Sequence, residues 1–284
     1  NSRFRNRIPY RLIHNKKIKM ISLIIPTYRN PLFLDICLKS AIEGQCEINE
    51  IIVAVDGYIE ESQSILDKYK DDIKVLNLGQ NQGMQMALNL GVYNASYEII
   101  CIINDDNVLS KGWDITIKEN LKKDEVLTIN QIEPTGPGIF NFPVNDFGKT
   151  PETFDYKGFL KYEEQIRQDK STKDGGIFPF AMWKIDYMIV GGFDTLYQSP
   201  FICDWDFFLK LDLNGLTFTR THKSHFYHFG SSATKNGKEG EAFKATEGPA
   251  ADTFAYKWGI APSLFENHSH NPKNKQLIKG IRYE

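Results

Sequence analysis

The stretch Ile99-Ile100-Cys101-Ile102-Ile103-Asn104-Asp105-Asp106-Asn107 decides the fold that this sequence predicts. Five apolar residues in a row predict a buried strand, and the strand runs into two adjacent carboxylates. Carboxylates directly after a buried strand cost free energy unless they lie at the carboxyl edge of a sheet and bind a cation or another positive group. Open α/β sheets bind ligands at that edge, where carboxylates suit Mg²⁺ or Mn²⁺ carrying a diphosphate. Taken alone, the stretch is equally compatible with a strand that ends in a solvated turn.

Strands and helices alternate at short spacing up to this stretch, which predicts an α/β fold with a mostly parallel, doubly wound sheet. Apolar runs predict strands over residues 20–26, 50–55, 73–78 and 98–103. Helical periodicity predicts helices from the capping pair Asn30-Pro31 onward, over 59–70 and over 84–93. The alternation is lost after about Lys123, and residues 133–151 are expected to form a long ordered loop. Regular structure is expected again near Phe178, with a helix over 203–213, a strand over 217–229 and a helix over 251–258.

The composition is typical of a globular protein, with 41% hydrophobic and 25% charged residues among 284 and a net charge of −2. This balance excludes the strongly basic field of a nucleic-acid-binding protein, so no nucleic-acid partner is expected. The first nineteen residues carry seven basic side chains and no acid, which suits an anionic membrane surface or, equally, a simple linker. The four cysteines lack metal-like or disulfide-like spacing, and no apolar run reaches 18 residues. We therefore expect a cytoplasmic protein, with peripheral membrane contact through the basic arm as an open alternative.

Four sites line up along the chain after the predicted strands. They are Pro26-Thr27-Tyr28-Arg29-Asn30, Asp56-Gly57, Asn104-Asp105-Asp106, and Gly191-Gly192-Phe193-Asp194 followed by Cys203-Asp204-Trp205-Asp206. Their order and spacing resembles the family 2 glycosyltransferases, inverting enzymes of the GT-A fold, over roughly residues 20–230. Asn81-Gln82-Gly83, followed by Asn89-Leu90-Gly91, also resembles a stretch that this family carries before its metal motif.

The resemblance implies a site for a nucleotide-sugar donor, which we expect to be UDP-linked. Pro26, Thr27 and Tyr28 are then expected to line the nucleotide pocket. Asp56 is expected to accept a hydrogen bond from the imide N–H of uracil, because a carboxylate offers only acceptors. Asp105 matches the middle position of the metal motif, which in the family is often near the ribose.

The resemblance also implies a divalent metal, Mn²⁺ or Mg²⁺. Asp106 matches the ligand acid of the family's motif, His228 resembles a late histidine that completes the metal shell, and Asn104 departs from the family's first acid. The three histidines His222, His225 and His228 also allow a zinc interpretation. On a strand, residues three apart face opposite sides, so His225 is not expected to share a face with His222 and His228. Structural zinc moreover usually takes four ligands.

The resemblance implies that Asp204 is the catalytic base, the acid of the family's Glu-Asp pair, with Cys203 in place of the Glu. Such a base takes a proton from the acceptor hydroxyl, opposite the leaving diphosphate, and a single in-line displacement then inverts the sugar. Asp206 and Asp194 are the nearest rivals for this role. Candidates for contact with the sugar or acceptor are Trp183, Gly192 and Trp205. For the two tryptophans, packing in the core is the alternative. Tyr256-Lys257-Trp258-Gly259 resembles a C-terminal segment of some bacterial and viral members.

The sequence thus predicts a metal-dependent inverting glycosyltransferase whose acceptor is a glycan, lipid-linked or protein hydroxyl. The expected parts are a basic arm (1–18), a nucleotide-sugar-binding half (19–123), an acceptor-binding and catalytic half (124–234) and a C-terminal extension (235–284). One alternative is a nucleotidyltransferase, which would normally carry a glycine-rich basic loop where Pro26-Thr27-Tyr28 stands. The other is a catalytically inactive module that binds a sugar nucleotide or a glycan, because Asn104 and Cys203 depart from the family pattern.

Overall fold

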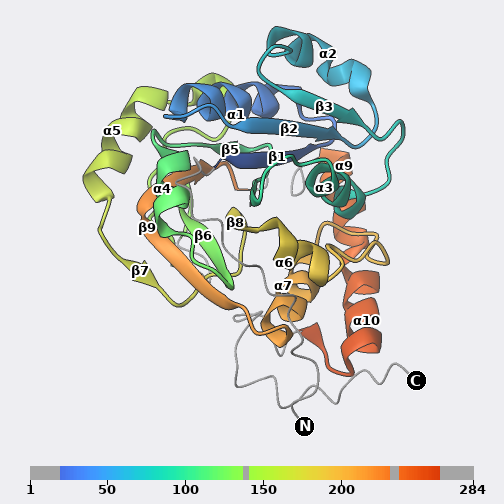
Figure 1. The fold of residues 1–284 in the computed structure, drawn as a ribbon. Helices are drawn as coiled ribbons and strands as arrows, with labels where there is room; N and C mark the ends of the chain where they lie inside the picture. Colours follow the sequence, from blue (N-terminus) through green and yellow to red (C-terminus); the bar gives the residue numbers. More distant parts are fainter. Residues whose placement is uncertain (1–19, 137–140, 231–236, 263–284) are drawn as a thin grey trace.

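The structure is a computed structural model that describes residues 20–136, 141–230 and 237–262. One sheet of nine strands runs through these residues, with helices on both of its faces (Figure 1). The strand order is β3-β2-β1-β4-β8-β6-β9-β5, and β7 pairs with β9. The basic arm predicted over residues 1–18 lies outside the described residues. In the part of the chain that the structure describes, no helix is both long enough and apolar enough to cross a membrane.

The first half of the chain confirms the predicted alternation. Its elements are β1 (Ile21–Thr27), α1 (Pro31–Gly44), β2 (Glu50–Val55), α2 (Ile59–Lys68), β3 (Lys74–Asn77), α3 (Met84–Tyr93) and β4 (Ile99–Ile102). β1 pairs in parallel with β2 and β4, and β2 pairs in parallel with β3. Every residue of β1 and β4 is buried, as expected of central strands that are covered on both faces.

The second half is more regular than the sequence predicts. Its elements are β5 (Asn107–Val108), α4 (Trp113–Asn120), β6 (Glu125–Ile132), η1 (Pro151–Thr153), α5 (Tyr156–Ile166), β7 (Ser171–Thr172), β8 (Phe180–Trp183), α6 (Lys184–Ile189), α7 (Cys203–Leu213), β9 (Thr217–His228), α9 (Gly237–Ala245) and α10 (Glu247–Trp258). The predicted helix over 203–213 and strand over 217–229 are confirmed as α7 and β9. The described residues between β6 and η1 form only an isolated bridge, which confirms the long loop predicted over 133–151, whereas β6 itself was not predicted. β6 escapes sequence analysis because polar residues interrupt its apolar pattern, yet all eight of its residues are buried.

Six of the nine strands run in one direction, which confirms the mostly parallel sheet. β8 is antiparallel to both β4 and β6, so β6 runs the same way as β4, and β9 is parallel to β6. The short strands β5 and β7 pair antiparallel with β9. The second half of the chain therefore continues the sheet that the first half begins.

Two apolar cores lie on opposite faces of the sheet, because successive side chains of a strand point to opposite sides. Leu23 and Ile25 of β1 pack in the core that holds α1, α2 and α4, whereas Ile24 packs in the core that holds α3, α6, α7 and α10. Helix α3 approaches β1 closely at Gly91, where an added Cβ would lie 2.5 Å from the side chain of Ile24. Helix α10 thus shares one core with α7, the helix that carries Asp204.

Candidate active site

The side chains that follow β1 and β4 meet at the carboxyl edge of the sheet. Thr27 Oγ1 donates a hydrogen bond to Asp105 Oδ2 at 2.7 Å, and Asn30 Nδ2 donates one to Asp105 Oδ1 at 3.0 Å. Burial and, next, the charge of Asp106 raise the pKa of Asp105 to about 7, although the two hydrogen bonds oppose this. Asn30 is the N-cap of α1 with Pro31 after it, as predicted, but its side chain makes no capping hydrogen bond to the helix and donates to Asp105 instead. A carboxyl group in this state becomes charged more readily when a cation comes near.

His228 lies beside Asp106 because β5 pairs with β9. This pairing sets Asn107 opposite His228. His228 Nε2 lies 3.5 Å from Asp106 Oδ1, and His228 Nδ1 lies 3.0 Å from Glu133 Oε1. In the neutral tautomer with its proton on Nδ1, the ring donates to Glu133 and turns its Nε2 lone pair toward Asp106. The sequence analysis missed Glu133 because this residue directly follows β6, a strand that the sequence does not predict.

Asp106 and His228 are chemically suited to a divalent cation. An imidazole nitrogen and a carboxylate oxygen that face each other both offer lone pairs, and a cation between them is attracted to both. Glu133 stands where an outer carboxylate commonly orients a metal-binding histidine. Among the described residues, no three or more His, Cys, Asp and Glu side chains are grouped so that they could hold a metal ion. Within the described part of the chain, Asp106 and His228 would supply two ligands, and oxygens of a diphosphate and of water could add others, as is usual for Mg²⁺.

Asp56, at the end of β2, holds the loop that precedes α3. Its Oδ1 accepts a hydrogen bond from Gln82 N at 2.6 Å, and its Oδ2 accepts one from Gly83 N at 3.0 Å. Burial raises the pKa of Asp56, although both hydrogen bonds oppose the shift. At the neighbouring Gly57, φ is +83° and an added Cβ would lie 2.7 Å from Asn81 N, so only glycine fits there. The Asp56-Gly57 turn therefore shapes the end of the sheet through backbone contacts.

Three aromatic rings gather next to this edge. Tyr28 meets Tyr58 edge-on at a centroid distance of 5.9 Å and Phe243 of α9 at 6.2 Å. The guanidinium carbon of Arg29 lies 4.7 Å from the centre of the Tyr58 ring. Arg29 and Tyr58 have left-handed backbones, with φ of 50° and 51°, a strain often found at ligand sites. These rings form a candidate wall for a nucleobase.

Asp204 lies in the first turn of α7, and its side chain is half-buried. Burial raises the pKa of Asp204 to about 6, against the backbone hydrogen bond that Trp205 N donates to its Oδ1 at 2.9 Å. No salt bridge to Asp204 occurs among the residues that the structure describes. A carboxylate with a pKa close to neutral and no salt bridge to a basic side chain has the properties of a general base.

Asp206, the alternative candidate for the base, is fully buried, and its carboxylate already has hydrogen-bond and ion-pair partners. Its Oδ1 accepts hydrogen bonds from Trp258 Nε1 at 2.8 Å and from the Tyr197 hydroxyl at 3.2 Å, and it lies 2.7 Å from Lys257 Nζ. The preceding Cys203 is also buried, and burial raises the pKa of its thiol well above the usual range. Neither side chain is therefore placed to take a proton from a substrate.

Trp183 is separated from the carboxylates. It pairs with Ile99 at the amino end of β4, because β8 runs antiparallel to β4. Asp105 and Asp106 follow the other end of that strand. The indole of Trp183 donates to Lys122 O at 3.0 Å. The structure therefore does not bring Trp183 to the site at which the sequence analysis expected it.

Three other expected site residues have mainly packing contacts. Pro26 is buried within β1, opposite Ala54 of β2. Gly192 has φ of +66°, and an added Cβ would collide with Asn89 and the Tyr187 ring. Trp205 is half-buried and packs against the core that contains α7. Of these, Trp205 stands next to Asp204 in the chain and keeps part of its surface exposed.

The histidines of β9 have separate partners. Between Thr221 and His225 the strand shifts register against β6, which breaks the alternation assumed from the sequence. The rings of His222 and His225 lie 6.4 Å apart, so the expectation that they face opposite sides is wrong. His222 Nδ1 lies 3.0 Å from Asn130 Nδ2, and His225 N donates to Glu163 Oε1 at 3.0 Å.

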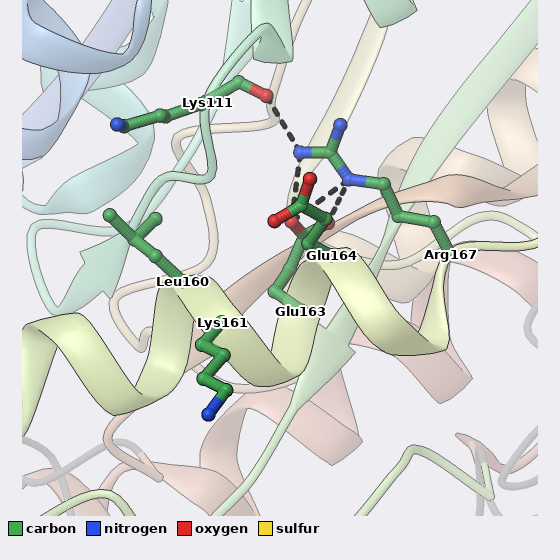
Figure 2. Close-up of a pocket in the computed structure, with 6 residues that line it drawn as sticks. All are labelled: Lys111, Leu160, Lys161, Glu163, Glu164 and Arg167. Carbon is green, nitrogen blue, oxygen red and sulfur yellow. Dashed lines mark hydrogen bonds and ion pairs between the residues drawn. The ribbon is translucent and has the colours of Figure 1, made fainter.

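A surface pocket on α5 contains the ion pair of Glu163 and Arg167 among its lining residues (Figure 2). Arg167 Nε lies 3.0 and 2.9 Å from the two carboxylate oxygens of Glu163, and Arg167 also donates to Lys111 O at 2.7 Å. Glu163 further accepts the backbone N–H of His225. Because these groups satisfy one another, they tie α5 to β9 and do not form a candidate catalytic site.

Comparison with known proteins gives one family. The family described as glycosyl transferase family 2 matches residues 22–188, which is 167 of the 284 residues. The chain is 27% identical over 115 residues to the poly-beta-1,6-N-acetyl-D-glucosamine synthase of Staphylococcus epidermidis, covering 40% of this chain and 28% of the synthase. The synthase of the same name from Staphylococcus aureus is 25% identical over 117 residues, with the same coverage. The chain thus matches less than a third of the length of these relatives.

Two solved structures share the architecture. GalNAc-T7 with UDP, GalNAc and Mn²⁺ has a TM-score of 0.56 and 14% identity, over 75% of this chain and 44% of that one. TarS of S. aureus, residues 1–349, has a TM-score of 0.54 and 15% identity, over 90% of this chain and 76% of that one. At these identities the likeness concerns the fold alone, and it confirms the GT-A fold that the sequence predicts.

Proposed function

The chain belongs to glycosyl transferase family 2, and we propose that it moves a sugar from a nucleotide donor to a hydroxyl acceptor with inversion at the anomeric carbon. One observation carries this proposal. Asp105, Asp106 and His228 meet at the carboxyl edge of β4, with Asp106 Oδ1 3.5 Å from His228 Nε2. A diphosphate leaving group needs positive charge, and this is the edge at which α/β sheets bind such ligands.

The donor is proposed to be UDP-linked, with Mn²⁺ or Mg²⁺ held by Asp106 and His228. The solved structure of GalNAc-T7 with UDP, GalNAc and Mn²⁺ supports this choice by analogy of fold. Thr27 and Tyr28 would contact the nucleotide, and Asp105 would approach the ribose. Asp56 would serve the uracil pocket through the loop that it holds and through its remaining lone pairs, since both of its oxygens already accept backbone hydrogen bonds.

The metal would neutralise the charge that grows on the diphosphate as the sugar leaves. On the other side of the sugar, Asp204 would take the proton of the acceptor hydroxyl as that oxygen attacks. General-base catalysis of this kind contributes roughly 10²- to 10⁴-fold. Because the attack and the departure occur on opposite faces, a single displacement inverts the anomeric carbon. Thr27 and Asn30 would fix the orientation of Asp105 before the donor arrives.

The proposed acceptor is a hydroxyl of a glycan, of a lipid-linked molecule or of a protein. The name of the staphylococcal synthases refers to a polymer of N-acetyl-D-glucosamine. Of the three kinds of acceptor, it therefore supports a glycan most directly. Contact of the basic arm with a membrane is proposed only as a way to reach a lipid-linked acceptor.

A thermal-shift panel tests the donor assignment. UDP-, GDP-, dTDP- and CDP-sugars would be added with and without Mn²⁺, and a donor that binds the folded state should raise the melting temperature. We expect the largest rise for a UDP-sugar with Mn²⁺, together with slow metal-dependent hydrolysis of that donor. Binding without hydrolysis or transfer would instead favour the inactive binding module. The absence of any shift throughout the panel would contradict the proposed function.

A further inference from the structure

Two motifs that the chemistry above leaves unused, one ending at Asp194 and one containing Lys257, meet Asp206 of α7 at one ammonium group. Lys257 Nζ, on α10, lies 2.6 Å from Asp194 Oδ2 and 2.7 Å from Asp206 Oδ1. Asp194 ends the Gly191-Gly192-Phe193-Asp194 motif, and Asp206 lies in the same helical turn as Asp204. Burial alone would lower the pKa of Lys257, but the two carboxylates outweigh it and raise that pKa above the usual value. Lys257 therefore remains charged between them.

Further hydrogen bonds and a second lysine hold the Asp206 carboxylate in place. The indole of Trp258 and the hydroxyl of Tyr197 both donate to its Oδ1, and Lys210 Nζ, one helical turn along α7, lies 3.7 Å from its Oδ2. Lys210 and Lys257 balance the charges of Asp206 and Asp194. Burial holds Tyr197 in its neutral form by raising its pKa far above the usual value, and the same holds for the thiol of Cys203.

The contrast with Asp204 shows what this arrangement can do. Two positions earlier in the helix, Asp204 makes no salt bridge within the described part of the chain, although its side chain is half-buried. We propose that Lys257 is a positioning residue for the base: it fastens α10 to the first turn of α7 and neutralises Asp206, so that Asp204 alone keeps an unpaired negative charge in that turn. The inference rests on the proposed function only in taking Asp204 as the base.

The physical reason is electrostatic as well as geometric. A second uncompensated carboxylate in the same turn would oppose the ionisation of Asp204, because like charges in a poorly solvated region repel strongly. A loosened turn would also misplace the carboxylate, and a displacement of about 1 Å in a reacting group can cost as much as 10²-fold in rate. Lys257 prevents both the repulsion between the carboxylates and the displacement of Asp204.

The test measures the pKa of Asp204 directly, in protein labelled with ¹³C-aspartate, with the signal assigned by its loss in Asp204→Asn. In Lys257→Met we expect that pKa to rise by roughly one unit, since of the four charged groups Lys210 alone then balances both Asp206 and Asp194. The double variant Lys257→Met with Asp206→Asn should return toward the wild-type value. Asp206→Asn alone should lower the pKa, because Lys257 then faces one carboxylate fewer. Asp206→Asn tests whether the Lys257–Asp206 pair affects the pKa of Asp204 even where Lys257→Met does not fold.

Kinetics supply the second readout. At a temperature at which the variants are folded, Lys257→Met should lower kcat roughly tenfold or more while the KM for the donor changes little. Lys68→Met is the matched control, because it breaks an exposed ion pair with Asp35 on another helix. An unchanged titration of Asp204 in the variants, or an unchanged kcat in Lys257→Met, would overturn the inference. Wild-type protein without any transfer activity would overturn the proposed function instead, and the titration would still decide the role of Lys257.

Discussion

Replacing Asp204 by asparagine is expected to make the protein more stable and, at the same time, nearly inactive. Asparagine keeps the size of the side chain and its ability to accept the Trp205 N–H, but it removes the charge and the basicity. Donor and metal should bind as before, because Asp204 is assigned to neither of the proposed binding sites. The value of kcat should fall by a factor on the order of 10² or more.

The gain in stability follows from the direction of the pKa shift. Burial raises the pKa of Asp204 from 3.8 to about 6, so the folded state binds the proton more tightly than the unfolded state does. The resulting penalty is absent below about pH 4 and complete above about pH 6. A shift of about two units corresponds to about 3 kcal/mol. Because the side chain is partly exposed, we expect Asp204→Asn to gain about 1–3 kcal/mol at neutral pH and little at pH 4.

Urea denaturation of wild type and variant near pH 7.5 and near pH 4 measures this difference, alongside the transfer rate. Asp206→Asn is the matched control two residues away. It breaks a buried ion pair, a change that typically costs about 3–5 kcal/mol, and its kcat should fall far less than that of Asp204→Asn. A variant at Asp204 that is less stable at neutral pH refutes the burial argument. If Asp206→Asn is the inactive variant while Asp204→Asn stays active, the motif has been placed in the wrong register.

Three further predictions concern the donor side. Asp106→Ala should abolish Mn²⁺-dependent UDP binding in calorimetry while circular dichroism stays that of the folded protein, and unchanged Mn²⁺-dependent turnover would remove Asp106 from the metal site. His228→Ala should raise the Mn²⁺ concentration needed for half activity, whereas His225→Ala should lower stability without this effect; identical metal responses would contradict the assignment. Asp56→Ala should weaken UDP binding by roughly 1.5–3 kcal/mol, the contribution of hydrogen bonds to a charged group, and equal affinities in calorimetry would show that neither the carboxylate nor its loop reads the base.

Sequence patterns were sufficient for the parts of the molecule that local interactions determine. The alternation of apolar runs with helical periodicity identified β1 to β4 and their helices, because each element buries a face that its own residues define. The same reasoning placed Asp105 and Asp106 after a buried strand, which the structure confirms. It failed at β6, whose polar residues are buried with partners from other elements, such as Gln131, which donates to Phe178 O at 2.8 Å.

The chain alone therefore determined the parallel strands β1 to β4, their carboxyl edge and the acids that stand there, since these follow from residue type and short spacing. Only the tertiary structure decided which side chains meet. Asn30 reaches Asp105 across 75 positions, Glu133 reaches His228 across 95, and Trp258 reaches Asp206 across 52. Such contacts depend on strand order and register, and here on a two-residue strand, β5, that joins β9. No local pattern encodes them, because the free energy of each pair comes from burial and charge that exist only once the separate elements have packed together.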